Sequence, residues 1–143
     1  MEAPLGASSG CTMSLSLFHM IPGAPTPVAP FSHAVEVDGW IFVTGQLPLE
    51  PGRETADLPV DVESQTRITM ANLLTVLSGL NLGLEHVVSA RCFLTDFEND
   101  YARFNAVYAT YFPKGRYPAR TCIGVTALAR GARVEIDFIA RRS

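Results

Sequence analysis

Apolar residues recur at helical spacing in two stretches of the chain. The first stretch follows Asp61, a residue type that caps helix N-termini, and predicts an amphipathic helix over about 62–80. The second stretch predicts a helix from about 99 to 112, and Pro113 stands just past its end. The stripes consist of Thr66, Thr69, Met70, Leu73, Val76, Leu77 and Leu80 in the first, and of Tyr101, Phe104, Tyr108 and either Tyr111 or Phe112 in the second.

Short runs of β-branched and aromatic residues predict six strands. Asp38 and Gly39 form a strong tight-turn signal between two of these runs and predict a hairpin. The turn at Ala129–Gly131 suits an antiparallel pairing of the last two strands. The predicted strands are 14–18, 34–37, 40–44, 87–94, 120–126 and 133–140.

The order of these elements is three strands, a helix, a strand, a second helix and two strands. This order predicts an α+β fold in which two helices pack on one face of a mixed sheet. The run 40–43 is apolar at every position, whereas a strand with one wet face alternates, so this strand should be covered on both sides. Because the helices cover only one face, a neighbouring subunit is the natural cover for the other.

The overall composition agrees with such an assembly. Apolar residues make up 48% of the 143 residues and charged residues only 17%, against about a quarter charged in a typical soluble domain. The net charge of −3 and the pI near 5.5 argue against nucleic-acid binding, which needs a basic face. No run of 18 apolar residues exists to span a membrane, and the N-terminus has no basic segment of the kind that begins a signal peptide.

The remaining bulk features indicate where the protein resides and how it is organised. Residues 1–12 are typical of a flexible tail, and 13–143 of one domain. The three cysteines and three histidines are too widely spaced for a disulfide framework or a metal site, so we expect no metal and a reducing, cytoplasmic location. These residues are Cys11, Cys92, Cys122, His19, His33 and His86.

Arg120 is the first candidate for chemistry. It stands at the start of an apolar strand, where an isolated cation is unfavourable. A guanidinium is a planar fork of donors that grips a carboxylate with two hydrogen bonds. Arg120 is therefore a candidate ligand-binding group, and the alternative is a salt bridge at a strand end.

Glu135 is the second candidate, in the middle of the last strand on the side opposite its apolar row. A carboxylate on a covered face should have a raised pKa and could act as a general base toward water. The alternative is an ordinary solvent-facing acid, which Asp137 on the same side makes plausible.

Three further positions are ambiguous. Cys122 should point to the same side as Arg120, and a small buried thiol is the simpler interpretation than a nucleophile. Asn105 lies beside the aromatic stripe of the second helix and needs a partner for its amide, which is either a ligand or a loop. Gly45 follows the buried strand, where it marks either a close approach to a ligand or a structural bulge.

At these positions the sequence resembles the reactive intermediate deaminase family, the RidA/YjgF type. The resemblance covers about residues 28–142 and is carried by several segments in combination. They are GWIFVTGQLP at 39–48, Asp61 with Gln65 and Asn72, FNAVY at 104–108, Tyr111 with Phe112, PARTC at 118–122 and VEI at 134–136.

The resemblance implies a chorismate-mutase-like α+β fold that assembles as a homotrimer, with sheets forming a central barrel and pockets between subunits. It implies hydrolysis of enamines and 2-imino acids, such as 2-aminoacrylate, to 2-keto acids and ammonia without a cofactor. In the family an arginine at the position of Arg120 binds the substrate carboxylate, and a glutamate at that of Glu135 positions or activates water. The backbone around Gly45 and Cys122 and the side chain of Asn105 would line the same pocket.

One departure from the family pattern leaves the function open. Many active members carry a tyrosine where this chain has Phe31, which keeps the aromatic wall of the pocket but loses the hydroxyl; nearby His33 is a candidate to compensate. A non-catalytic, carboxylate-binding or regulatory trimer is therefore the alternative to a deaminase. RNA cleavage, a label that some family members carry, is disfavoured by the acidic pI and the single lysine, Lys114.

Overall fold

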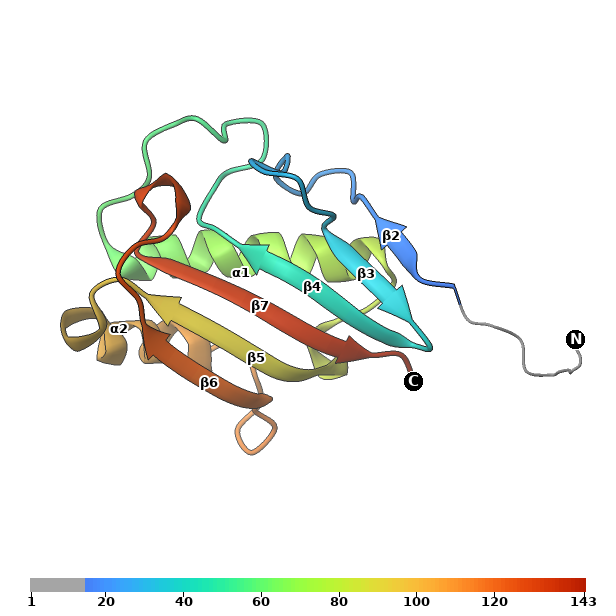
Figure 1. Ribbon diagram of the computed structural model, residues 1–143. Helices are drawn as coiled ribbons and strands as arrows, with labels where there is room; N and C mark the ends of the chain where they lie inside the picture. The colour runs from blue at the N-terminus through green and yellow to red at the C-terminus, as the bar shows by residue number, and fades with distance from the viewer. Residues whose placement is uncertain (1–14) are drawn as a thin grey trace, which may run out of the picture.

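The computed structural model describes residues 15–143 and places them in one six-stranded sheet with two α-helices (Figure 1). The predicted tail at 1–12, and Cys11 within it, lie outside the described residues. The strands are β2 (Leu17–His19), β3 (Ala34–Val37), β4 (Trp40–Gln46), β5 (Val87–Leu94), β6 (Ala119–Gly124) and β7 (Val134–Arg141). The helices are α1 (Val62–Gly79) and α2 (Phe97–Ala109), and two 3₁₀ turns are η1 (Leu84–His86) and η2 (Ala129–Gly131).

The sheet has the strand order β2-β3-β4-β7-β5-β6. Strands β5 and β6 run parallel and are joined by the α2 crossover, while every other neighbouring pair is antiparallel. The predicted β3–β4 hairpin is confirmed: Asp38 and Gly39 both have positive φ, 52° and 79°, as a two-residue hairpin turn requires.

The expected antiparallel pairing of the last two strands is wrong. β7 does not pair with β6; it inserts between β4 and β5 in the middle of the sheet (Figure 1). The physical reason is the α2 crossover, which lays β6 parallel to β5 on its outer side and leaves the inner edges of β4 and β5 unpaired. β7 forms backbone hydrogen bonds with both β4 and β5, and β6 is left as an outermost strand of the sheet.

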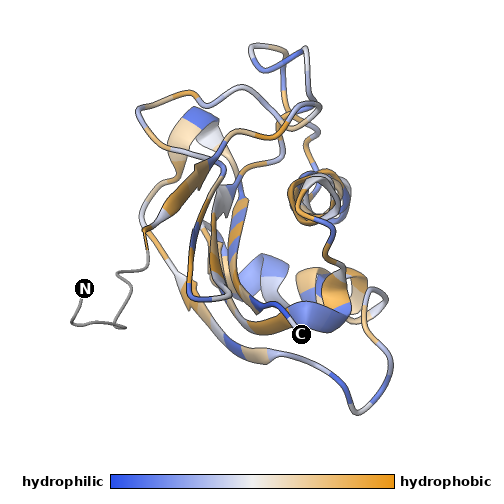
Figure 2. Cartoon of the chain, turned by 90° about the vertical axis from the view of Figure 1, so that its right-hand side faces the viewer, coloured by the Kyte–Doolittle hydropathy of each residue, from blue (hydrophilic) through white to orange (hydrophobic). Residues whose placement is uncertain are grey.

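Both helices cover the same face of the curved sheet, as the sequence predicts (Figure 2). The side chains of β7 that face them are buried, as are those of the α1 stripe. The largest buried side chains are Phe104, Phe138, Ile41, Met70, Leu73, Leu77, Leu94 and Ile136. None of the helices in residues 15–143 is both long and apolar enough to span a bilayer.

A polar cap begins α1, and a polar side chain in the middle of the helix fixes the long loop that follows β4. The Asp61 carboxylate accepts a hydrogen bond from the Ser64 N–H at 2.8 Å and caps the helix. The buried Asn72 amide donates to the carbonyls of Leu47 and Leu49, at 3.0 and 2.7 Å. Asn72 therefore serves the loop backbone rather than solvent, whereas Thr66 and Thr69 donate to carbonyls of α1 itself.

The other face of the sheet is uncovered in the single chain. Phe18, Val35, Phe42 and Ile139 are paired across four strands and form an apolar row on this face. Phe18 is 72% exposed and Phe42 46% exposed. Cover by a neighbouring subunit thus stays a prediction, and we call this surface the open face.

Candidate functional site

Arg120 lies on the helix side of the edge strand β6. It pairs in register with Ala90 of β5, which pairs with the buried Phe138, so all three side chains belong to the helix-covered face. Its Nη1 donates to Oδ1 of Asn105 at 2.9 Å, and its Nη2 makes a longer bond of 3.4 Å to the hydroxyl of Tyr101. Both partners are neutral side chains of α2.

Three aromatic rings of α2 surround the guanidinium of Arg120. Its Cζ lies 5.0 Å from the ring centroid of Tyr108, 5.6 Å from that of Phe104 and 5.9 Å from that of Tyr101. Such contacts attract a cation without neutralising it. No carboxylate among residues 15–143 pairs with Arg120, so the strand-end salt bridge considered from the sequence is not formed within the described chain.

The free edge of β6 adds backbone donors beside Arg120. The N–H of Val125 donates to the carbonyl of Leu94 in β5, at 2.9 Å. Because backbone direction alternates along a strand, the N–H groups of Thr121 and Ile123 also point toward β5. Those of Arg120 and Cys122 therefore point outward from the sheet, where a bound anion can accept from them.

Cys122 lies on the same face as Arg120, as its spacing predicts, next to the fully buried Cys92. Burial raises the pKa of the Cys122 thiol, and the positive charge of Arg120 opposes the rise only in part. Burial raises the pKa of Cys92 to about 12. Both groups are therefore thiols near neutral pH rather than nucleophilic thiolates, which favours a structural role for the Cys122 side chain.

Glu135 points to the open face and lies against Gly45. Between Val43 and Gln46 strand β4 carries one more residue than β7, so Thr44 and Gly45 form a β-bulge. A side chain at position 45 would overlap Oε2 of Glu135. Burial raises the pKa of the Glu135 carboxyl, and the charge of Asp137 raises it further.

Phe31 and Gly45 line a depression of about 580 Å³ on the open face. Phe42 supplies an apolar wall, Thr44 also lines the depression, and the Asp137 carboxylate there is paired with Arg91 at 2.7 Å. The structure thus brings Phe31, Gly45 and Glu135 together on one face, and Arg120, Asn105 and Cys122 together on the other.

Within one chain these two groups do not meet. Arg120 is in register with Ala90 and Glu135 with Phe93, so the two site residues differ by three positions along β5 and lie on its opposite sides. Strand spacing puts their Cα atoms about 14 Å apart, with side chains on opposite faces of the sheet. A single small acid cannot contact both in one copy of the chain.

His33 does not substitute for the missing hydroxyl of Phe31. The ring is 3% exposed and both of its nitrogens have backbone partners. Nδ1 accepts from the N–H of Ile21 at 2.8 Å, and Nε2 donates to the carbonyl of Pro25 at 2.7 Å. His33 therefore fixes the segment between β2 and β3 that contains Ile21 and Pro25, and neither ring nitrogen is free for a ligand.

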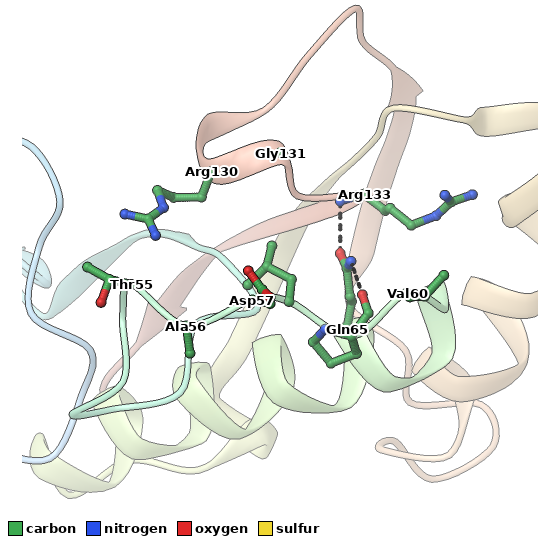
Figure 3. A pocket seen from close by; sticks show the side chains of 10 residues that line it. Thr55, Ala56, Asp57, Val60, Gln65, Arg130, Gly131 and Arg133 are labelled. Carbon is green, nitrogen blue, oxygen red and sulfur yellow. Dashed lines mark hydrogen bonds between the residues drawn. The ribbon is translucent and has the colours of Figure 1, made fainter.

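A second depression, of about 450 Å³, lies apart from the predicted residues, between the loop 55–60 and the turn before β7 (Figure 3). Both polar atoms of the Gln65 amide have backbone partners there: Oε1 accepts from the N–H of Arg133 at 2.8 Å, and Nε2 donates to the carbonyl of Pro59 at 2.6 Å. The Arg133 side chain turns away toward α2, and Arg130 projects over the depression. This surface contains none of the candidate site residues.

Sequence reasoning missed two tyrosines of the site, because their spacing indicates only a core stripe. Tyr108 is buried as expected, but its hydroxyl has no hydrogen-bond partner among residues 15–143. Tyr101 is 36% exposed and lies beside Arg120 at the margin of the stripe. The available signal was the residue type, since a tyrosine in place of phenylalanine needs a partner for its hydroxyl.

Comparison with known proteins identifies close relatives of this chain. Residues 22–142 match the family model described as Endoribonuclease L-PSP. Protein DfrA of Myxococcus xanthus is 44% identical over 119 residues, which are 82% of this chain and 88% of DfrA. TdcF of Escherichia coli, whose full name is "Putative reactive intermediate deaminase TdcF", is 32% identical over 122 residues, 84% of this chain and 92% of TdcF.

Solved structures of similar proteins share the fold. The yeast protein YEO7 superposes with a TM-score of 0.82 at 33% identity, over 90% of this chain and all (100%) of that one. The structure of E. coli TdcF with bound serine gives a TM-score of 0.78 at 31% identity, over 87% of this chain and 99% of TdcF.

Proposed function

Because the chain belongs to the Endoribonuclease L-PSP family, the RidA/YjgF type, we propose that it is an enamine/imine deaminase. Its substrates are 2-aminoacrylate and related 2-imino acids, and its products are 2-keto acids and ammonia. The name of TdcF and the serine bound in its crystal structure support a small amino-acid-derived carboxylate as the ligand.

The observation that carries the proposal is the uncompensated charge of Arg120. Among the described residues it has only a neutral amide, a hydroxyl and aromatic rings for partners. Two of the five N–H donors of a guanidinium are used in these bonds, which leaves three for a ligand. A substrate carboxylate supplies the missing negative charge and accepts two parallel hydrogen bonds.

The proposed active site is shared by two copies of the chain. One copy supplies Arg120 with the outward N–H groups of β6, and its neighbour supplies Glu135, Gly45 and Phe31 from its open face. In a homotrimer with three such sites, Arg120 of one chain can lie next to Glu135 of a neighbour, although the two are far apart within one chain. The same assembly covers the apolar row on the open face.

The chemistry needs positioning, a base and a proton source. The enamine CH₂=C(NH₂)COO⁻ first takes a proton on its methylene carbon and loses one from nitrogen, which gives the imine. Water then adds to the electrophilic C2: its oxygen bonds to carbon, and Glu135 accepts a proton. That proton passes to the nitrogen, which gives the carbinolamine. The hydroxyl proton then moves through Glu135 to the amino group, the C–N bond breaks as the C=O bond forms, and ammonia leaves with a 2-keto acid. No step changes the overall oxidation level, so no redox cofactor is required.

The raised pKa of Glu135 suits the base role. A carboxylate with its ordinary pKa is a weak base near neutrality, and burial beside Asp137 strengthens it. Oε2 of Glu135 occupies the space beside Gly45 that a side chain would fill, so the glycine lets the carboxylate lie against the bulge.

A coupled assay tests the proposal. An amino-acid oxidase generates the imino acid, a semicarbazide trap competes for it, and the protein should divert it to the 2-keto acid faster than spontaneous hydrolysis. Arg120→Ala should abolish the effect. Arg116→Ala, which removes an exposed arginine four residues earlier, should leave it intact. A wild-type rate equal to the spontaneous rate would refute the deaminase activity.

Phe31 favours a second candidate function, a non-catalytic trimer that binds carboxylate metabolites. Phe31 lines the open-face depression without a hydroxyl, and His33 is occupied by the backbone. This alternative predicts that 2-keto acids raise the melting temperature through Arg120 while no imine is turned over. The same assay with a thermal shift measurement separates the two functions.

A further inference from the structure

We infer that Tyr101 is a further ligand-binding residue, whose hydroxyl donates to the anion held by Arg120. The inference rests on the proposed function, because it adds a donor to the same carboxylate site. Tyr101 and Arg120 belong to the same chain, so their relation does not depend on how copies assemble.

The direction of the existing hydrogen bond leaves the Tyr101 proton free. Nη2 of Arg120 donates to the Tyr101 oxygen at 3.4 Å, so the oxygen is the acceptor in this pair. A phenol has one proton of its own to donate, and no acceptor for it is present among residues 15–143. The side chain is 36% exposed, which keeps this donor accessible from outside the protein.

The ring of Tyr101 is held so that the donor keeps its direction. It stacks on Phe97 one helical turn earlier, with centroids 4.5 Å apart and an interplanar angle of 20°. Phe97 in turn packs against Gly124 at the end of β6, where an added Cβ would come within 3.1 Å of the Phe97 Cβ. The glycine thus lets α2 approach the edge strand. The packing of the ring keeps the Tyr101 hydroxyl in a fixed position beside Arg120.

The arrangement favours a 2-oxo or 2-imino acid over a simple monocarboxylate. Two N–H groups of Arg120 pair with the two carboxylate oxygens, and the hydroxyl beside Nη2 adds a third donor at one end of the group. A 2-oxo acid has an additional acceptor next to its carboxylate, whereas acetate does not. Tyr108 cannot serve in this way, because its hydroxyl is fully buried.

The test is Tyr101→Phe, which keeps the ring stack and the contact with the guanidinium and removes only the hydroxyl. The dissociation constant of pyruvate or 2-oxobutyrate, measured by calorimetry, should rise about tenfold or more, since hydrogen bonds to charged groups are the stronger kind. The affinity for acetate should change less. In the deaminase assay KM should rise by a larger factor than kcat falls. A general loss of structure would not produce this difference.

Two controls separate the possible failures. Tyr117→Phe removes the hydroxyl of another exposed tyrosine and should change neither affinity nor melting temperature. If Arg120→Ala abolishes binding while Tyr101→Phe binds like the wild type, the inference about Tyr101 is wrong and the carboxylate site stands. If the wild type binds no 2-keto acid and diverts no imine, the proposed function itself fails.

Discussion

The carboxylate of Glu135 occupies the space that a side chain at position 45 would need, since a Cβ built on Gly45 overlaps Oε2 of Glu135. The glycine is therefore required by the carboxylate. Gly45→Ala should displace Glu135 and lower kcat at least tenfold while Arg120-dependent ligand binding persists. A double mutant with Glu135→Ala should lose no more activity than Glu135→Ala alone. Additive losses would mean that the two positions act independently.

Glu135→Gln should stabilise the folded protein although it removes the proposed base. Burial and Asp137 raise the pKa of this carboxyl in the folded chain, so folding favours the protonated form. The charged form costs stability in full above the raised, folded-state pKa, and this cost falls to zero as pH drops from that value to the unfolded-state pKa. Glu135→Gln should therefore melt at a higher temperature than the wild type at neutral pH, and the difference should shrink at acid pH.

The same substitution tests the base. Wild-type kcat/KM should decline on the acid side, as Glu135 becomes protonated, with an apparent pKa above the ordinary glutamate value. Glu135→Gln should have low activity and no such decline. If the variant showed the same decline of kcat/KM at acid pH, the decline would belong to the titration of another group.

The ion pairs of the buried Asp100 should contribute strongly to the stability of the folded chain. Asp100 is fully buried and accepts from Nε and Nη2 of Arg133 at 2.8 and 3.0 Å, and from Nη2 of Arg103 at 2.8 Å. These bonds connect α2 to the start of β7. Asp100→Ala should lower the free energy of unfolding by about 3 kcal/mol, near the lower end for a broken buried pair because both arginines can rehydrate.

An exposed pair supplies the control for Asp100. Glu50 accepts from Arg53 at 2.7 Å, but both side chains are at least half exposed. Glu50→Ala should change the free energy of unfolding by less than about 1 kcal/mol. Urea titrations of both variants and the wild type measure the two differences. Equal losses for the two variants would contradict the structural role given to Asp100.

The unpartnered hydroxyl of Tyr108 predicts an unusual outcome. Removal of a buried polar group that has no hydrogen bond relieves its desolvation cost and retains the ring beneath Arg120. Tyr108→Phe should therefore be as stable as the wild type, or more stable by up to about 1 kcal/mol, with unchanged ligand affinity. A clear loss of stability in denaturant titration would reveal a bound water or another partner for this hydroxyl.

Local chemistry accounts for what the sequence predicted well. The Asp61 cap and the spacing from Thr66 to Leu77 define α1, and two residues with positive φ, Asp38 and Gly39, define the hairpin. Alternation along a strand put Cys122 on the side of Arg120 and Glu135 opposite the buried row. Each of these features depends on residues within a few positions of one another.

Features that depend on distant pairing were not predictable in the same way. Nothing near β7 specifies that it pairs with β4 and β5 rather than with its sequence neighbour β6, because the α2 crossover decides this. Without that register, the opposite orientations of Arg120 and Glu135 could not be derived. The exposure of Tyr101 also depends on where the edge of the sheet lies, since its stripe partners Phe104 and Tyr108 are buried.

The separation of Arg120 from Glu135 makes the shared site testable by mixing two inactive proteins. Arg120→Ala and Glu135→Ala, each inactive alone, should be unfolded together and refolded at equal amounts, so that their chains assemble at random. A site between neighbours is intact where the Glu135→Ala chain supplies Arg120 and the Arg120→Ala chain supplies Glu135, which occurs at about a quarter of the interfaces. Activity should therefore return to about a quarter of the wild-type rate. Refolding each variant separately before mixing is the control and should restore nothing. If co-refolded material of wild-type size on a sizing column stays inactive, the two residues do not act in one site between copies.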